Sequence, residues 1–292
     1  MLGLDASGFN FPRPLHIFDN DSSILLDGVG DAIRVSKSQG MLGLTSFTYG
    51  VFIGQAQGLY SGQQNGVRNI MGNSFNGGTS ISWLNKKFYA TVYVKSAGVP
   101  GAFLQVSTPE DVFDGQDVSD GSSFSTGTNG FNLVVLNWHQ NRLKLYIGGG
   151  IGGGMGNDLY LVGSVTSTLS NVYYPGDSSL IADFGIGGTI SGSTITNTTA
   201  CAFNQAFYFN GDIPIDVLKT IYNNGEGIDM LNPSPSVVSG GGEYTSSHIE
   251  SLLLNLRMEQ QSQDQIVDST GLQSCSLEGD ADYIAISPQK IA

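Results

Sequence analysis

The feature that most constrains the fold is a change from strand chemistry to helix chemistry within residues 203–229. The first part of this segment is rich in phenylalanine, and aromatic side chains are enriched in β-strands. The second part offers Asp212 as a helix cap, apolar residues at helical spacing, and Asn224 with Gly225 at the end. We therefore expect a strand followed by a helix over residues 213–224. Such a helix has only about three turns, so it must pack against a larger structure.

Upstream of this helix, the sequence predicts short strands joined by tight turns. Apolar and polar residues alternate over residues 46–53, 87–94 and 143–147, and residues 131–138 form a further apolar run. Turn dipeptides rich in asparagine and glycine separate these segments, and the 41 glycines of the chain exceed the usual share of roughly 7%. Because no helical pattern lies between the strands, we expect an all-β protein, a two-sheet antiparallel sandwich.

Charge limits the partners of this chain. It has 25 acidic and 12 basic residues and a formal net charge of −13. A nucleic-acid backbone or an anionic membrane requires a basic face, so we expect neither as a partner. No segment approaches the ~18 apolar residues needed to span a bilayer. The N-terminal residues also lack the basic and apolar regions of a secretory signal, which indicates synthesis and assembly in a cytoplasm.

The chain contains two cysteines, Cys201 and Cys275. They exclude a framework of several disulfides, but they allow either one bridge or two free thiols. We expect two buried free thiols, because nothing else in the sequence indicates processing in an oxidising compartment.

Three phrases of the sequence resemble the laminin-G-like, or concanavalin-A-like, jelly rolls. Residues 211–225 match the family phrase G-x-[IL]-[PS]-x-x-x-[IL]-x-x-[IL]-Y-N-x-G, and residues 23–35 resemble its opening strand pair, S-L-x-F-D-G-x-x-D-Y-V-x-V. Residues 138–148 resemble a hairpin of the family in which a tryptophan is followed by an asparagine and the phrase L-x-L-Y-I. The three phrases occur in the family's order. The resemblance implies a jelly-roll sandwich, although a fold does not define a function.

The region after residue 231 changes in composition, which suggests four segments. We expect an N-terminal arm (1–22), the jelly roll (23–231), a Pro/Ser/Gly-rich linker (232–247) and a C-terminal β arm (248–292). The end of this arm, residues 277–286, repeats the pattern of residues 26–35. The arm is too short for a second complete unit. It therefore either completes the sandwich or pairs with the sheet edge of a neighbouring subunit.

The sequence offers no candidate catalytic residue. Retaining glucanases of this fold carry their carboxylates on one strand as E-x-D-x-x-E, and this phrase is absent. The three histidines do not lie in a nucleophile-elbow context, and no His/Cys pair falls at metal-ligand spacing. We expect no enzymatic activity.

Carbohydrate binding requires an exposed aromatic platform with amides and carboxylates nearby. Tyr60, Trp83 and the pair Tyr173-Tyr174 are the aromatic candidates, and the last pair lies in the most loop-like segment. The candidate glycan-binding residues are therefore Tyr173, Tyr174, Asn171 and Asp177. The alternative is that these aromatic side chains belong to the core.

The resemblance also implies a Ca²⁺ ion at a loop rim, since oxygen ligands suit this hard cation. The aspartates in or beside predicted loops are Asp27, Asp31, Asp158, Asp177 and Asp183. The alternative is that these aspartates form turns. We expect no obligatory cofactor.

The order of a jelly roll, the phrase I-Y-N-x-G and a tail containing D-S-T-G resembles structural proteins of tailed bacteriophages, particularly marine ones. This resemblance implies a non-enzymatic virion protein that serves in capsid decoration, in a head or tail fibre, or as a tail adhesin. Its partners would be other virion proteins, copies of itself and a host-surface glycan. It would be made in the host cytoplasm and located in the virion. The alternative is an extracellular bacterial carbohydrate-binding or adhesion module.

Overall fold

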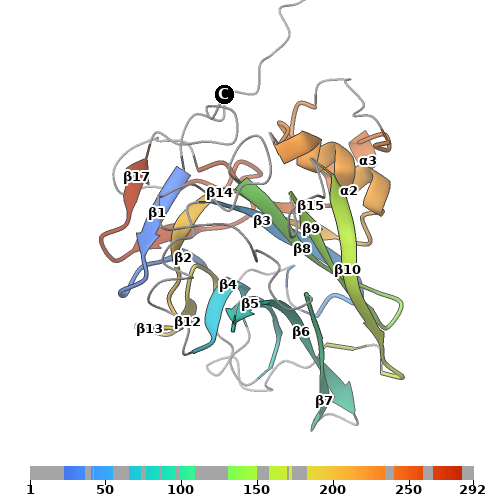
Figure 1. Cartoon of the computed structure of the whole chain (residues 1–292), viewed down its shortest axis with the longest axis horizontal. Helices are drawn as coiled ribbons and strands as arrows, with labels where there is room; N and C mark the ends of the chain where they lie inside the picture. The colour runs from blue at the N-terminus through green and yellow to red at the C-terminus, as the bar shows by residue number, and fades with distance from the viewer. Residues whose placement is uncertain are drawn as a thin grey trace, which may run out of the picture.

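Two antiparallel sheets pack face to face and form a sandwich (Figure 1). The computed structural model describes residues 23–36, 41, 43–54, 66–73, 77–85, 87–96, 99–108, 131–149, 158–169, 171–172, 183–225, 227–233, 240–258 and 266–284. Within these residues, the predicted all-β jelly-roll sandwich is confirmed.

The first sheet has eight strands. Across it lie β10 (Leu159–Thr166), β9 (Arg142–Gly148), β8 (Phe131–His139), β3 (Phe47–Gly54), β14 (Ala200–Asn210), β1 (Ser23–Asp27) and β17 (Asp282–Ile284), and β15 (Leu252–Leu256) also pairs with β14. The β8–β9 turn contains Gln140 and Asn141 with φ values of 48° and 63°. Two residues with positive φ are typical of the tight hairpin turn that the sequence predicts here.

The second sheet has seven strands. Across it lie β16 (Cys275–Glu278), β2 (Ala32–Val35), β11 (Phe184–Ile186), β4 (Arg68–Gly72), β5 (Thr79–Leu84), β6 (Lys87–Ser96) and β7 (Val99–Ser107). A separate hairpin is made of β12 (Thr189–Ser191) and β13 (Thr194–Thr196).

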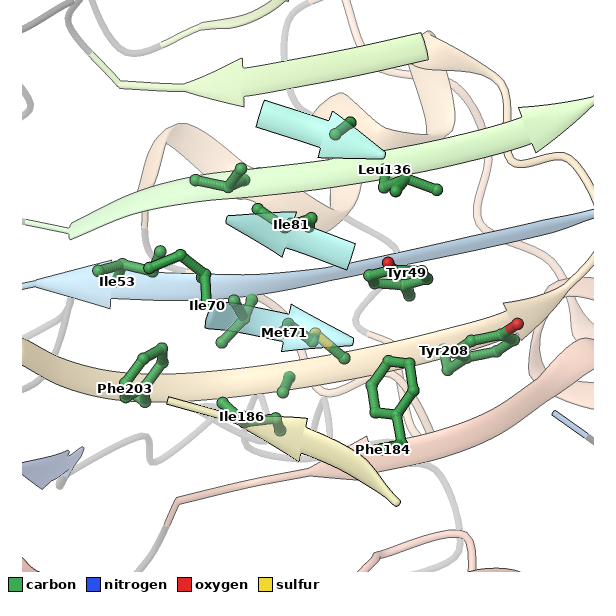
Figure 2. Close-up of a cluster of buried hydrophobic side chains, with 14 of the residues drawn as sticks. Tyr49, Ile53, Ile70, Met71, Ile81, Leu136, Phe184, Ile186, Phe203 and Tyr208 are labelled. Carbon is green, nitrogen blue, oxygen red and sulfur yellow. The ribbon is translucent and has the colours of Figure 1, made fainter. Parts of the chain in front are cut away.

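The main core lies between the two sheets. Because side chains alternate along a strand, every second residue points inward. Figure 2 shows core side chains of both layers, with Tyr49, Ile53, Leu136, Phe203 and Tyr208 from the first sheet and Ile70, Met71, Ile81, Phe184 and Ile186 from the second. The consecutive residues Ile70 and Met71 both belong to the core, because the pairing register of β4 with β5 shifts between Asn69 and Met71. Both Cys201 and Cys275 are free thiols, as the sequence predicts, but only Cys201 is buried in this core and Cys275 is half-buried.

A second core covers the outer face of the eight-stranded sheet. The predicted helix is present as α2 (Ile215–Tyr222), followed by the short 3₁₀ helix η3 (Asn223–Gly225). The predicted cap is wrong, because the N-cap is Pro214 and the Asp212 carboxylate instead accepts a hydrogen bond from Nδ2 of Asn137. Leu218 and Ile221 of α2 pack against apolar side chains of β3, β8 and β14. A further helix, α3 (Ser246–Ser251), begins inside the predicted linker and was not expected. Neither α-helix in the described residues is long and apolar enough to cross a bilayer.

Strand β14 has one edge that is shared by two partners. Its first half pairs with β1 and its second half pairs with β15. Asn204 and Gln205 lie between the halves, where the register with β3 shifts. Both amides are fully buried, and Nδ2 of Asn204 donates to Ser23 while Nε2 of Gln205 donates to the Ile228 carbonyl and to Asn255. These bonds pair the amide nitrogens of Asn204 and Gln205 at the point where β14 changes partner, whereas Oε1 of Gln205 and Nδ2 of Asn255 have no hydrogen-bond partner among the described residues.

The C-terminal strands pair within this chain. β15 pairs with β14, β16 with β2, and β17 with β1. The two copies of the repeated sequence pattern lie side by side. Residues 26–33 run from the first sheet to the second, and residues 277–284 run antiparallel to them, from the second sheet to the first. The glycines at equivalent places, Gly28 and Gly279, have nearly equal φ values of 85° and 86°. Each copy therefore has a glycine with positive φ at the equivalent place between the two sheets.

Candidate functional site

The outer face of the second sheet carries a row of polar and aromatic side chains. Along β5 and β6, Ile81, Ala90 and Val92 point into the core. The alternate residues must therefore point outward, because side chains of a strand alternate between its two faces. The outward set on β5, β6 and β7 is Ser80, Ser82, Leu84, Tyr89, Thr91, Tyr93, Phe103 and Gln105.

These outward side chains line a cavity of about 530 Å³. Its size lies within the range of roughly 300–1,000 Å³ that is usual for small-molecule sites. We call it the β4–β7 groove. Its described lining residues are Val67, Asn69, Ser80, Ser82, Leu84, Tyr89, Thr91, Tyr93, Phe103, Gln105, Thr189 and Asn197.

Strand register places these side chains in rows across the sheet. Asn69 of β4 lies opposite Ser82, which lies opposite Tyr89. In the next row, Ser80 lies opposite Thr91, which lies opposite Gln105. The first row therefore has one short hydroxyl side chain between an amide and an aromatic side chain, and the second has two short hydroxyl side chains beside an amide.

Polar groups form the floor of the groove. The side chains of Ser80, Ser82 and Thr91 are buried although they lie on the outer face. Nε2 of Gln105 donates a hydrogen bond of 3.1 Å to Oγ1 of Thr91. This bond fixes the Gln105 amide above the floor, where it and the hydroxyls can exchange hydrogen bonds with a ligand.

Asn69 holds a defined orientation at one side of the groove. Its Nδ2 donates to the carbonyl of Gly188 at 2.7 Å and to that of Gly185 at 3.4 Å. Its Oδ1 has no hydrogen-bond partner among the described residues, although Asn69 is only 3% exposed. A flip that exchanged Oδ1 and Nδ2 would break both of these donor bonds. The orientation of the amide is therefore fixed, and the atom without a partner is a hydrogen-bond acceptor.

Two aromatic rings lie at the other side. The ring centroids of Tyr93 and Phe103 are 6.1 Å apart, and the ring planes are tilted by 44°. Phe103 is 61% exposed, so its ring lies at the surface and not in the core.

The β12–β13 hairpin forms one wall through Thr189 and Asn197. Its tip is held by Arg34, whose Nη2 donates to the carbonyl of Gly192 at 2.8 Å. Near its base, Oγ1 of Thr199 donates to the Asn69 carbonyl at 2.9 Å. The wall is thus tied both to β2 and to β4.

Of the four predicted glycan-binding residues, Asn171 alone lies within the described residues, and it is not part of the described lining of the groove. Tyr60, Tyr173, Tyr174 and Asp177 lie outside the described residues. Asn171 is exposed, and its backbone carbonyl accepts a hydrogen bond of 2.8 Å from the Lys95 backbone amide.

The suggestion of Trp83 as an aromatic platform is wrong. Its side chain is 1% exposed and packs edge-on against Phe88 in the core. Trp83 lies one residue beyond the outward Ser82, so the alternation of β5 turns it inward.

The structure gathers two of the predicted calcium ligands. Carboxylate oxygens of Asp27, Asp31 and Asp280 lie within 4.8 Å of one another. Burial raises the pKa of Asp31 above its usual value, although its oxygens accept backbone N–H groups of Asp27 and Asp280. Asp158 and Asp183 lie elsewhere, in ion pairs with Lys219 and Arg34. Calcium binding at the three clustered carboxylates stays a prediction.

The sequence contained a signal for the groove that was not used. Residues 87–94 alternate between apolar and polar, which predicts the strand and also marks Tyr89, Thr91 and Tyr93 as one face. The missing information was which strands lie beside β6, because Asn69 and Gln105 reach the same face only through sheet pairing.

No protein-family model matches the sequence, and no curated protein matches it. Among solved structures, a candidate carbohydrate-binding protein from Bacteroides ovatus is 15% identical with a TM-score of 0.55, and the match covers 91% of this chain and 60% of that one. The present chain thus spans about 60% of the length of that protein. This likeness supports the fold: the chain is a jelly-roll sandwich.

Two further structures have lower TM-scores. A heptameric SAP-like pentraxin from Limulus polyphemus is 12% identical with a TM-score of 0.43, covering 92% of this chain and 96% of that one. The enzymatically active domain of tailspike protein 2 from bacteriophage CBA120 is 10% identical with a TM-score of 0.39. The match covers 66% of this chain and 26% of that one.

Proposed function

We propose that this protein is a non-enzymatic, glycan-binding jelly-roll domain and that the β4–β7 groove is its binding site. The observation that carries this proposal is the aromatic pair of half-buried Tyr93 and exposed Phe103 beside a floor of hydroxyl and amide side chains. A sugar ring has apolar C–H faces and hydroxyl edges. Aromatic rings can pack against the apolar faces, while hydroxyl and amide side chains can form hydrogen bonds with the hydroxyl edges.

The lining chemistry supports binding rather than hydrolysis. Glycoside hydrolysis requires two carboxyl groups on opposite sides of the scissile bond. The described lining residues include no aspartate, glutamate, histidine or cysteine. The groove as described can therefore orient a sugar but lacks the pair of carboxyl groups that this hydrolysis requires. The description of the Bacteroides ovatus protein as a candidate for carbohydrate binding agrees with this proposal.

A glycan array followed by calorimetry tests the proposal. We expect a subset of glycans to bind, and we expect Phe103→Ala or Tyr93→Ala to weaken binding about tenfold, because an aromatic contact contributes on the order of 1–2 kcal/mol. Leu161→Ala is a matched control, since Leu161 is an exposed apolar residue of β10 that does not line the groove. Absence of binding to any glycan, or an equal loss in the control, would contradict the proposal.

From the sequence resemblance alone, we further propose that this domain is a structural component of a tailed-phage virion, with other virion proteins and copies of itself as partners. A host-surface glycan would then occupy the groove. The extracellular bacterial module remains the alternative. Mass spectrometry of purified phage particles distinguishes them, because a virion component must co-purify with capsid and tail proteins in a fixed ratio.

A further inference from the structure

We infer that the β4–β7 groove selects uncharged glycans over acidic ones and that Asn69 accepts a hydrogen bond from a sugar hydroxyl. This inference rests on the proposed function and adds the class of ligand. It follows from the charges around the groove and from the fixed orientation of one amide.

The described lining of the groove carries no charged side chain. A carboxylate or sulfate of an acidic sugar would lose hydration on entering and would need a cation in return. Lys87 and Lys95 lie at opposite ends of β6, and neither is part of the described lining. The net charge of −13 further opposes the approach of an anionic polymer.

Two arginines lie near the hairpin wall. Arg68, between the lining residues Val67 and Asn69, is not part of the described lining, and its Nη1 donates to the Thr198 carbonyl at 3.3 Å. The other is Arg34, which is already engaged. Its guanidinium contacts the carboxylates of Asp183 and Glu278 and donates to the Gly192 carbonyl. Recruitment of this side chain by an acidic sugar would break a partly buried ion-pair cluster. The wall therefore presents the neutral side chains of Thr189 and Asn197 to the ligand.

Asn69 determines whether one group of the ligand must donate or accept a hydrogen bond. Both donor bonds of its Nδ2 are made to protein carbonyls, and its Oδ1 lacks a partner among the described residues. The ligand group that satisfies Oδ1 must be a donor. A sugar hydroxyl supplies a donor, whereas a carboxylate supplies only acceptors.

The first experiment compares neutral oligosaccharides with their uronic-acid or sulfated counterparts of equal length, using the intact protein. We expect the best neutral probe to bind at least about tenfold more tightly than its acidic counterpart. We also expect its Kd to change less than about twofold between about 0.01 M and 1 M salt, over which the screening length falls from about 30 Å to 3 Å. Lys87→Gln and Lys95→Gln should leave this Kd unchanged.

The second experiment tests Asn69 with deoxy analogues of the best neutral probe. We expect one deoxy analogue to bind the wild type about tenfold more weakly, which is the usual effect of leaving one polar group unpaired. Asn69→Ala should lose affinity for the parent sugar but should not distinguish it from this analogue. A thermal unfolding curve for Asn69→Ala confirms that the variant is folded.

The outcomes separate this inference from the proposed function. If no glycan binds, both fail. If acidic glycans bind best and Phe103→Ala abolishes that binding, the groove is a glycan site but the inferred selectivity is wrong. If Asn69→Ala still distinguishes every deoxy analogue as the wild type does, the assignment of Asn69 is wrong.

Discussion

Nε of Arg34 in β2 donates a hydrogen bond of 2.7 Å to Oε1 of Glu278 in β16. The same guanidinium contacts Asp183 and the Gly192 carbonyl. One side chain thus joins the second strand of the chain, a strand near its C-terminal end, and the hairpin that borders the groove.

This pairing makes stability dependent on pH. Burial alone would raise the pKa of Glu278, but hydrogen bonds from Arg34 and Ser276 and the charge of Arg34 outweigh it and lower the pKa. A carboxyl with a lowered pKa stabilises the fold above its ordinary pKa of about 4.3, and this contribution is lost as pH falls through the lowered value. We expect Glu278→Gln to cost roughly 0.5–1 kcal/mol at neutral pH. The difference from wild type should vanish under strongly acidic conditions.

Glu250→Gln is the matched control for Glu278→Gln, since it removes one negative charge from an exposed position on α3. Chemical denaturation of both variants at neutral and acidic pH measures the effect. An equal loss in both variants, or a Glu278→Gln deficit that persists in acid, would contradict a role for the ion pair.

Asp268 organises the loop between β15 and β16. Its carboxylate accepts hydrogen bonds from the backbone amides of Asn255, Thr270, Leu272 and Gln273 and from the Thr270 hydroxyl. We expect Asp268→Ala to lower the free energy of unfolding by about 3 kcal/mol, because the buried amide of Asn255 and three partly buried amides lose their acceptor. Ser269→Ala, at a position that does not donate to this carboxylate, should change it by less than about 0.5 kcal/mol. Urea unfolding curves of the two variants check this difference.

Gly72 ends β4 where the backbone of β5 comes close. Its φ is +144°, and an added Cβ would lie 2.3 Å from the Thr79 carbonyl oxygen. Gly211 has a similar φ of +133° but open space around the Cβ position. Alanine at either position is therefore strained by the positive φ, but only alanine at position 72 also clashes with the backbone of β5. We expect Gly72→Ala to be less stable than Gly211→Ala by roughly 1–3 kcal/mol in urea unfolding.

Neither cysteine should react in the folded protein. Burial raises the pKa of Cys201 well above its usual value. Burial and, secondly, the charge of Asp268 raise the pKa of Cys275 to about 12. Because the thiolate is the reactive form, a chromogenic disulfide reagent should react slowly until denaturant is added and should then titrate two thiols. Ser193→Cys, in the exposed turn of the β12–β13 hairpin, is a positive control that should react at once.

Local patterns in the sequence were sufficient to predict several elements. The alternation of residues 87–94 and the phrase around Asn141 depend on neighbours along the chain, and both β6 and the β8–β9 hairpin are present. Helix α3 was missed because it is short and begins at Thr245, within a segment whose composition suggests a linker. Its capping bonds between Thr245 and His248 are a local signal that could have identified it.

The candidate site was harder to predict than the fold. Asn69, Thr91 and Gln105 are unremarkable in sequence, and they form one surface only because β4, β5, β6 and β7 pair in a particular register. Aromatic residues were the search criterion, but aromatic content alone does not distinguish inward Trp83 from outward Phe103. That distinction depends on which face of each strand meets the core.

The crossing of residues 26–33 beside residues 277–284 has a consequence for synthesis on the ribosome. Strands β1 and β2 are among the first described strands to emerge, yet their partners β17 and β16 are among the last. Until then, one edge of each early strand has no native neighbour, and pairings of such long sequence separation form slowly. One edge of β1 and one edge of β2 therefore stay unpaired in the nascent chain until β16 and β17 are synthesised. A chaperone that shields these edges would raise the yield of folded protein.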